Sequence, residues 1–180
     1  MSYSMASNTY KVLKGQGYTP EQDLVSRKMR KKLVVTEKNQ RYELDCSAST
    51  SIVLGSCVFA IDGGVIPKET STPKCDKLIL CALKIDGQQA KEKLEEEESW
   101  LEIFVELKGH DVEHAIDQLE ATLKNNLFVH DSNKLVLARI VATSIPSNRS
   151  NPKLEKAKIR FRKNYRCELK TIKSNNPERY

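Results

Sequence analysis

The chain has 180 residues, of which 39% are hydrophobic and 30% are charged. That is enough for one domain with a proper core, and too apolar a composition for wholesale disorder. No apolar run approaches the roughly 20 residues that a membrane span needs, so we expect no membrane partner. The first residues also lack the charged and then apolar pattern of a secretory signal.

The five cysteines are odd in number and show no C-x-x-C spacing. No histidine lies close enough to Cys75 and Cys81 to complete a zinc site. This usage predicts reduced, mostly buried thiols in a cytoplasmic protein.

The net charge of +6 is unevenly distributed along the chain. An acidic run at 95–98 separates two basic clusters, which favour a polyanion partner such as DNA; a solvated surface is the alternative. The nucleic-acid-binding residues expected in these clusters are Arg27, Lys28, Arg30, Lys31, Lys32, Lys156, Arg160, Arg162 and Lys163.

The N-terminal part is expected to form a flexible leader over residues 1–18 and then a helix over about 19–30. Thr19 is placed as the N-cap of that helix, Pro20 at its first position and Gln22 at the capping-box position. Strands are expected at 33–36, 42–45, 51–62, 76–85 and 100–108, and a polar, solvent-exposed excursion at 88–98.

The clearest periodic signal follows Asp111, the expected N-cap of a one-faced helix. Its apolar residues recur at i, i+3, i+4, i+7 and i+11: Val112, Ala115, Ile116, Leu119 and Leu123. A strand at 135–142, a basic helix at 151–164 and a strand at 167–172 are expected to follow. This order predicts an α/β protein, a mixed sheet with helices on its faces, in a single domain over 19–180.

The strand at 100–108 ends in a pair of opposite charges. Alternate side chains share a face of a strand, so Glu106 and Lys108 should point the same way while Val105 and Leu107 pack inward. Asp76 could supply a second carboxylate. Two carboxylates suit Mg²⁺, and the Leu107 carbonyl could add a third oxygen. Lys108 could then act on an attacking water.

This pattern resembles the PD-(D/E)XK nuclease superfamily, whose motif is an acidic residue at one strand, Glu/Asp-x-Lys on the neighbouring strand, and a following helix. Asp76 and Glu106-Leu107-Lys108 match that motif, and Gln118 matches the glutamine that several branches carry on the next helix. Small uncharacterised members with a Val-Glu-Leu-Lys-Gly strand also tend to carry Asp-Gly upstream, as at Asp62-Gly63 here.

The resemblance covers about 42–145. It implies a restriction-endonuclease-like core, with a mixed four- or five-stranded sheet flanked by helices, and Mg²⁺-dependent cleavage of DNA, with Mn²⁺ as a substitute. The basic segment at about 151–172 lies outside this core. Enzymes of this kind usually cut both strands as dimers, so a homodimer is a further expectation. A further acidic residue is expected at Glu21, Glu43 or Asp62.

Two departures from the family pattern are visible. Cys75 stands before Asp76 where the motif has proline, and about 30 residues with an acidic insertion separate Asp76 from Glu106. The alternative functions are a catalytically inactive nucleic-acid- or protein-binding module on the same fold, and an unrelated α/β protein with a basic surface.

Overall fold

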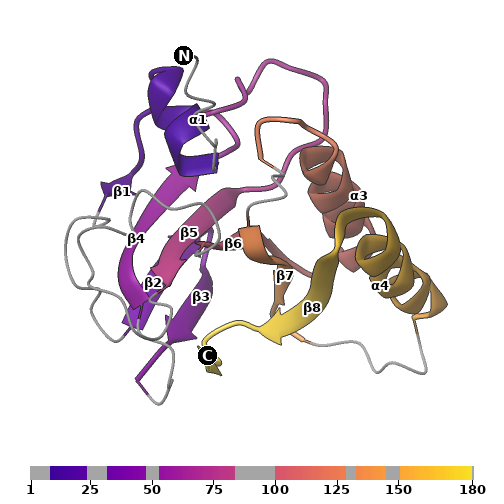
Figure 1. Cartoon of the computed structure of the whole chain (residues 1–180). Coiled ribbons are helices and arrows are strands. Elements are labelled where there is room, and N and C mark those ends of the chain that lie inside the picture. Colours follow the sequence, from indigo (N-terminus) through magenta and orange to yellow (C-terminus); the bar gives the residue numbers. More distant parts are fainter. Residues whose placement is uncertain are drawn as a thin grey trace.

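The computed structural model describes residues 9–23, 32–47, 53–83, 100–128, 133–144 and 151–179. Figure 1 shows its elements along the chain. In order they are α1 (Thr9–Gly15), β1 (Gln22–Asp23), β2 (Lys32–Glu37), β3 (Gln40–Asp45), β4 (Val53–Ala60), β5 (Lys77–Leu83), β6 (Trp100–Gly109), α3 (Val112–Leu123), β7 (Asn133–Ala142), α4 (Pro152–Tyr165), β8 (Cys167–Lys173) and β9 (Glu178–Arg179).

The main sheet has six strands in the order β1-β4-β5-β6-β7-β8. The pairs from β1 to β6 are antiparallel, and β6–β7 and β7–β8 are parallel. Parallel neighbours need a crossover connection, and α3 and α4 lie in the chain between them. The expected mixed α/β sheet is confirmed, but four or five strands was too few, because β1 and β8 extend it.

The two faces of the main sheet carry different layers, whereas helices were expected on both. Buried residues of α1, α3 and α4 join one apolar cluster, and those of β2 and β3 join the other. In Figure 1, α3 and α4 lie together beside β7 and β8. In the described part of the chain, then, helices cover one face and the small sheet β2-β3-β9 the other. None of the described helices has the length and apolar character needed to cross a bilayer.

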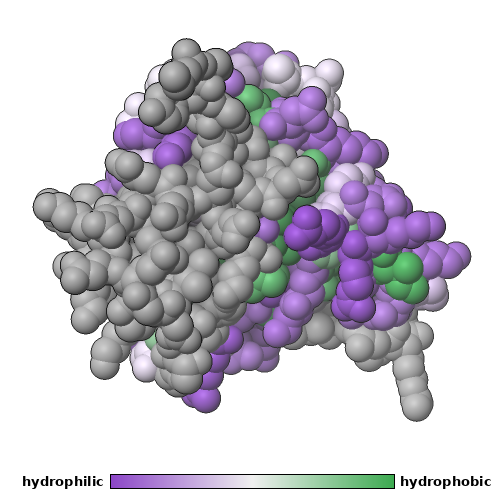
Figure 2. Space-filling model, viewed as in Figure 1, coloured by the Kyte–Doolittle hydropathy of each residue, from purple (hydrophilic) through white to green (hydrophobic). Residues whose placement is uncertain are grey.

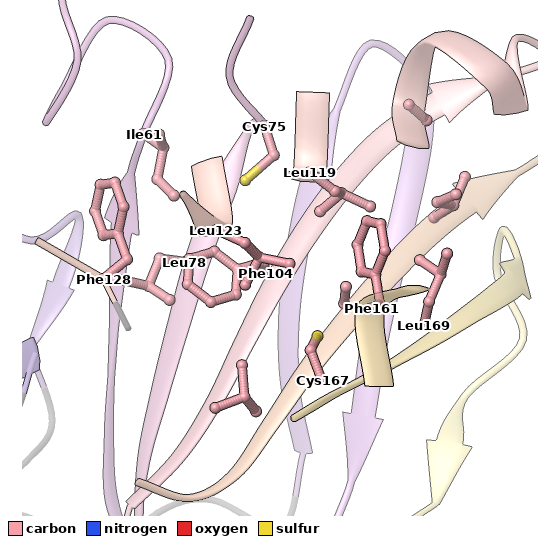
Figure 3. Packing of buried hydrophobic residues seen from close by; sticks show 14 of the residues in the cluster. Ile61, Cys75, Leu78, Phe104, Leu119, Leu123, Phe128, Phe161, Cys167 and Leu169 are labelled. Carbon is pink, nitrogen blue, oxygen red and sulfur yellow. The ribbon is translucent and has the colours of Figure 1, made fainter. Parts of the chain in front are cut away.

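Strand β6 is buried on both faces. Phe104 packs on the helix side, at the edge of the Phe128 ring with a centroid separation of 5.9 Å. Figure 3 shows Phe104 among Leu78 and Leu123 in this layer. Val105 and Leu107 face the small sheet, as their alternation predicts. The strand that carries the candidate site is therefore fixed from both sides.

Helices α3 and α4 begin where the sequence predicts. The Asp111 carboxylate accepts from the His114 backbone N–H at 3.0 Å, and the Asn151 side chain accepts from Leu154 N–H at 3.0 Å. These N-caps satisfy backbone donors that have no partner inside the helix. Arg166, in a left-handed conformation, ends α4.

Two N-terminal expectations are wrong. The leader contains α1, whose Thr9 and Leu13 are buried and whose Tyr10 stacks on Trp100 at 5.5 Å. The helix expected from Thr19 does not begin there, because the Glu21 N–H donates to the Val58 carbonyl and β1 pairs with β4. Residues 24–31, which hold most of the first basic cluster, and the acidic run at 95–98 lie outside the described residues.

A buried carboxyl group joins α1 to the main sheet. Thr9 Oγ1 lies 2.8 Å from Glu102 Oε1 and 2.9 Å from the Phe128 carbonyl, and Asn133 Nδ2 donates to the other Glu102 oxygen. The carbonyl can only accept, so the single hydroxyl proton of Thr9 serves it. The proton between Thr9 and Glu102 must then come from the carboxyl group. Burial raises the pKa of Glu102 to about 8, although the contacts with the Thr9 and Asn133 side chains act in the opposite direction, so Glu102 is protonated at neutral pH.

The Glu102→Gln variant should lose part of the pH dependence of stability. Because the folded-state pKa is raised, native Glu102 keeps its proton between about pH 4.5 and 8 while the unfolded chain has lost it. The free energy of unfolding therefore falls as the pH rises through that window, by up to about 1.4 kcal/mol per pH unit. Glutamine can make the same hydrogen bonds without titrating. Urea unfolding at pH 5, 6, 7 and 8 measures the slope, with Glu69→Gln in an exposed loop as control; equal slopes for wild type and Glu102→Gln would contradict the assignment.

A buried arginine of the main sheet forms an ion pair with β9, the last strand of the small sheet. The Arg139 side chain, on β7, is only 3% exposed, and its Nε donates to both carboxylate oxygens of Glu178 at 3.0 and 2.8 Å. Glu178 also accepts from the Tyr42 hydroxyl at 2.7 Å, and β9 runs parallel to β3. The Arg139 charge is thus neutralised by Glu178 of β9.

Glu178→Ala should destabilise the fold strongly. It leaves the Arg139 guanidinium buried without its main counter-charge, which typically costs about 3–5 kcal/mol. Glu168→Ala is the matched control, because Glu168 also contacts Arg139, at 3.1 Å, but its side chain is 52% exposed. That exposed pair should contribute less than about 1 kcal/mol. Denaturant unfolding of both variants gives the comparison, and similar losses for the two would contradict it.

Candidate functional site

Asp76 and Glu106 come together at the end of β6. In the antiparallel pair β5–β6, Lys77 lies opposite Val105, so continuing the register by one residue sets Asp76 opposite Glu106. Opposed residues of such a pair point to the same face. The Asp76 carboxylate also accepts from the Leu107 N–H at 2.7 Å, which fixes its orientation against β6.

Both carboxyl groups are poorly solvated, and the charge of Asp76 raises the proton affinity of Glu106. Glu106 is 2% exposed, and its Oε2 atom has no hydrogen-bond partner among the described residues. Burial, and then the charge of Asp76, raise the pKa of Glu106 to about 8, with the Lys108 charge acting in the opposite direction. Burial also raises the pKa of Asp76, although the Leu107 N–H works against it. A cation placed between the two carboxyl groups would favour their charged forms and so lower the pKa of each.

Lys108 is held beside the two carboxyls by α3. Its ammonium donates to Gln118 Oε1 at 3.2 Å, and Gln118 Nε2 donates to the Lys74 carbonyl at 2.8 Å. A carbonyl only accepts, so this bond fixes which end of the Gln118 amide faces Lys108. Gln118, expected from the sequence near the site, therefore contacts the lysine, and the backbone before Asp76 holds the glutamine in place.

The other acidic residues that the sequence offered for the site form ion pairs with lysine or arginine side chains. Glu21 lies 2.6 Å from Lys77, Glu43 contacts Lys32 and Arg41, and Asp62 lies 3.7 Å from Lys74. Leu107 packs its side chain against the small sheet. Nothing in the structure tests its carbonyl as a metal ligand, so that role stays a prediction.

One residue that the sequence analysis missed is Glu37, at the end of β2. Its charge contributes to raising the pKa of both Asp76 and Glu106. The alternation Leu33, Val35, Glu37 could have indicated that this side chain shares the inward face of β2. The position of that hairpin beside β6, however, could not be read from the sequence.

The basic residues of α4 divide into two groups. Arg160 donates from two nitrogens to the two Glu120 oxygens at 2.8 Å each, so it joins α4 to α3. Lys156, Arg162 and Lys163 are exposed. Figure 2 shows a mostly hydrophilic surface on the side where α3 and α4 lie. In the first cluster Lys32 is described, and it pairs with Glu43 and Asp45.

The donor set fits a hard divalent cation only in part. Among the described residues, no three or more His, Cys, Asp or Glu side chains group closely enough to hold a metal. Mg²⁺ typically takes one or two carboxylates and keeps several waters. Asp76 and Glu106, with the unpartnered Glu106 oxygen, suit that coordination.

No family model, curated protein or solved structure matches this chain. What the site can do chemically is therefore inferred from its own residues.

Replacing Glu106 should stabilise the protein at high pH. Above about pH 8 the native carboxylate is ionised, buried and repelled by Asp76, so Glu106→Gln should raise the free energy of unfolding by about 1–3 kcal/mol at pH 9 and by less at pH 6. Glu120→Gln is the contrasting control, because the hydrogen bond from Arg160 lowers the pKa of Glu120. That variant should be destabilised. Unfolding curves at both pH values test the pair, and a Glu106→Gln variant less stable than wild type at pH 9 would contradict the expectation.

Proposed function

We propose that the protein is a Mg²⁺-dependent nuclease that hydrolyses phosphodiester bonds in DNA. The observation that carries the proposal is the opposition of Asp76 and Glu106 on neighbouring strands, with Lys108 held on the same face by Gln118 of the following helix. This is the order of parts in the PD-(D/E)XK motif. The mixed sheet is compatible with it, and the restriction-endonuclease-like core is part of the proposal.

The roles follow from the chemistry of each group. Asp76 and Glu106 hold the cation, Mg²⁺ or in its place Mn²⁺, and the Leu107 carbonyl is the proposed third protein oxygen. When bound, the ion supplies positive charge against the phosphate in the transition state. Lys108 donates hydrogen bonds and so can orient a water or stabilise the leaving oxygen. Gln118 sets the direction of the Lys108 ammonium, which must be correct before any acid–base role.

DNA would be bound by the exposed cations of α4. Lys156, Arg162 and Lys163 are available for phosphates, whereas Arg160 is engaged by Glu120. Such contacts weaken steeply with salt. A homodimer that cuts both strands stays part of the proposal. So does a reducing cytoplasmic compartment, which suits the five free cysteines.

The second candidate is a binding module that has lost catalysis. One observation favours it: the described residues supply two close carboxylates rather than a group of three metal ligands. In that case Asp76, Glu106 and Lys108 would form an internal charge cluster with no reaction to support. The same experiment separates the two candidates.

Purified protein should cut plasmid or single-stranded DNA with Mg²⁺ or Mn²⁺ and not with EDTA. Asp76→Asn, Glu106→Gln and Lys108→Ala should each lower the rate by about 100-fold or more, because each removes a group that acts on the reacting phosphate or water. Lys124→Ala and Glu69→Gln, which change the same charges away from the site, should keep the wild-type rate. Gel electrophoresis of timed digests measures it.

Two results would count against the nuclease. Cleavage that survives Glu106→Gln and Lys108→Ala would come from another site or a contaminant. DNA binding by gel shift without metal-dependent cutting, unchanged by Glu106→Gln, would identify the binding module instead.

A further inference from the structure

The segment that leads into β5 is attached to α3 at two consecutive residues. The Lys74 carbonyl accepts from Gln118 Nε2 at 2.8 Å. The next residue, Cys75, donates its backbone N–H to the Thr122 hydroxyl at 2.9 Å, and its side chain lies in the same apolar cluster as the buried residues of α3 (Figure 3). Asp76 follows directly, so its backbone starts from a point that is fixed to the helix.

The Thr122 hydroxyl makes two hydrogen bonds inside the protein. Besides accepting from Cys75, it lies 2.9 Å from the backbone carbonyl of Gln118, four residues earlier in α3. A carbonyl can only accept, so the hydroxyl proton points to Gln118 and the hydroxyl oxygen takes the Cys75 N–H. Thr122 is 1% exposed, so water has little access to replace its hydroxyl. The bond within the helix is common for threonine, whereas the bond to Cys75 reaches a different segment.

The contact depends on the residue that stands before Asp76. The PD-(D/E)XK motif has proline at this position, and proline carries no backbone N–H. Cys75 supplies the donor that proline would lack. The departure from the motif at Cys75 is therefore what makes the hydrogen bond to Thr122 possible.

The same part of α3 is connected to both sides of the candidate site. The Gln118 side chain accepts from the Lys108 ammonium at 3.2 Å. One turn later, Thr122 holds the backbone before Asp76, whose carboxylate accepts from the Leu107 N–H at 2.7 Å. The helix thus fixes Lys108 through one side chain and Asp76 through another, and without the Thr122 hydroxyl one of these two connections is lost.

We propose that Thr122 is a positioning residue whose hydroxyl fixes the backbone before Asp76 to α3 and so sets where the Asp76 carboxylate lies opposite Glu106. It acts through the Cys75 N–H. The importance of that position for binding a cation rests on the proposed function.

Hydrogen exchange at the Leu107 amide tests the role without any metal, because the acceptor of this amide is the Asp76 carboxylate. In cation-free protein, Thr122→Val should speed this exchange about tenfold relative to the Ile103 amide of the same strand, as expected when one hydrogen bond is weakened. Thr122→Ser keeps the hydroxyl and should exchange as wild type does. Thr9→Val also removes a buried, hydrogen-bonded hydroxyl, but on α1, and should affect both amides alike. NMR measures the two rates.

Isothermal titration of Mn²⁺ into the full chain tests what this position does for the proposed cation. Thr122→Val should weaken the affinity about tenfold, the usual size of the loss when a group that orients a ligand is removed. Thr122→Ser should recover most of it, and Thr9→Val should bind as wild type does although its unfolding temperature also falls. Affinities that follow the unfolding temperature in all three variants, rather than the hydroxyl at position 122, would make Thr122 merely structural and overturn the inference.

The outcomes distinguish the two proposals. Unchanged Leu107 exchange in Thr122→Val, or faster exchange with unchanged Mn²⁺ affinity, overturns the role of Thr122 and leaves the nuclease intact. Exchange and Mn²⁺ affinity that both depend on the Thr122 hydroxyl, without DNA cleavage, overturn the nuclease and leave the positioning role. A wild-type chain that binds no Mn²⁺ overturns the nuclease, and the Leu107 exchange then still supports or overturns the hold of Thr122 on Asp76.

Discussion

The antiparallel register between β5 and β6 is the constraint on which the candidate site depends. It sets Lys77 opposite Val105 and hence Asp76 opposite Glu106. A slip of one residue would turn every β6 side chain to the other face, placing Glu106 and Lys108 against the small sheet and Val105 against α3. Burial on both faces of β6 makes that slip costly, so the packing of the core also fixes the geometry of the charges.

Strand β6 carries two buried glutamates, and their contrast is informative. Glu102 and Glu106 lie on the same face, and burial raises the pKa of each to about 8. Both oxygens of Glu102 have partners, so Glu102 is a satisfied group that joins α1 to the sheet. Glu106 keeps one oxygen without a partner and faces a second carboxyl group. A buried acid left in this condition destabilises the fold, which is expected where a site is built for a ligand.

Local signals in the sequence predicted the elements whose causes are local. Asp111 and the apolar face of α3 are adjacent in the chain, and the apolar run of β5 marks a strand covered on both sides. Helix α1 escaped prediction because its apolar face amounts to one turn, and β9 because two residues carry no pattern. At Thr19 the residue types of a helix N-terminus are present, but the Glu21 N–H donates to the Val58 carbonyl, so this segment pairs with β4 instead of starting a helix.

For the site, strand order was sufficient to bring Asp76, Glu106 and Lys108 to one edge. The pairing of Arg160 with Glu120 could not be read from the sequence, because Glu120 lies on another helix, forty residues away. Glu37 was missed for the same kind of reason, since it reaches the edge only through the packing of the small sheet on β6.

The small sheet is therefore more than a cover for the apolar face. One end of its hairpin contacts Gly109 and Thr143 beside the site, and its other end pairs with β9, where Glu178 neutralises Arg139 inside the main sheet. The hairpin is thus fixed at both ends to strands β6 and β7, which also position Glu106 and Lys108. Because Glu37 pairs with Gln40 at the first of these attachments, its position is set by the same contacts that hold the hairpin against the main sheet.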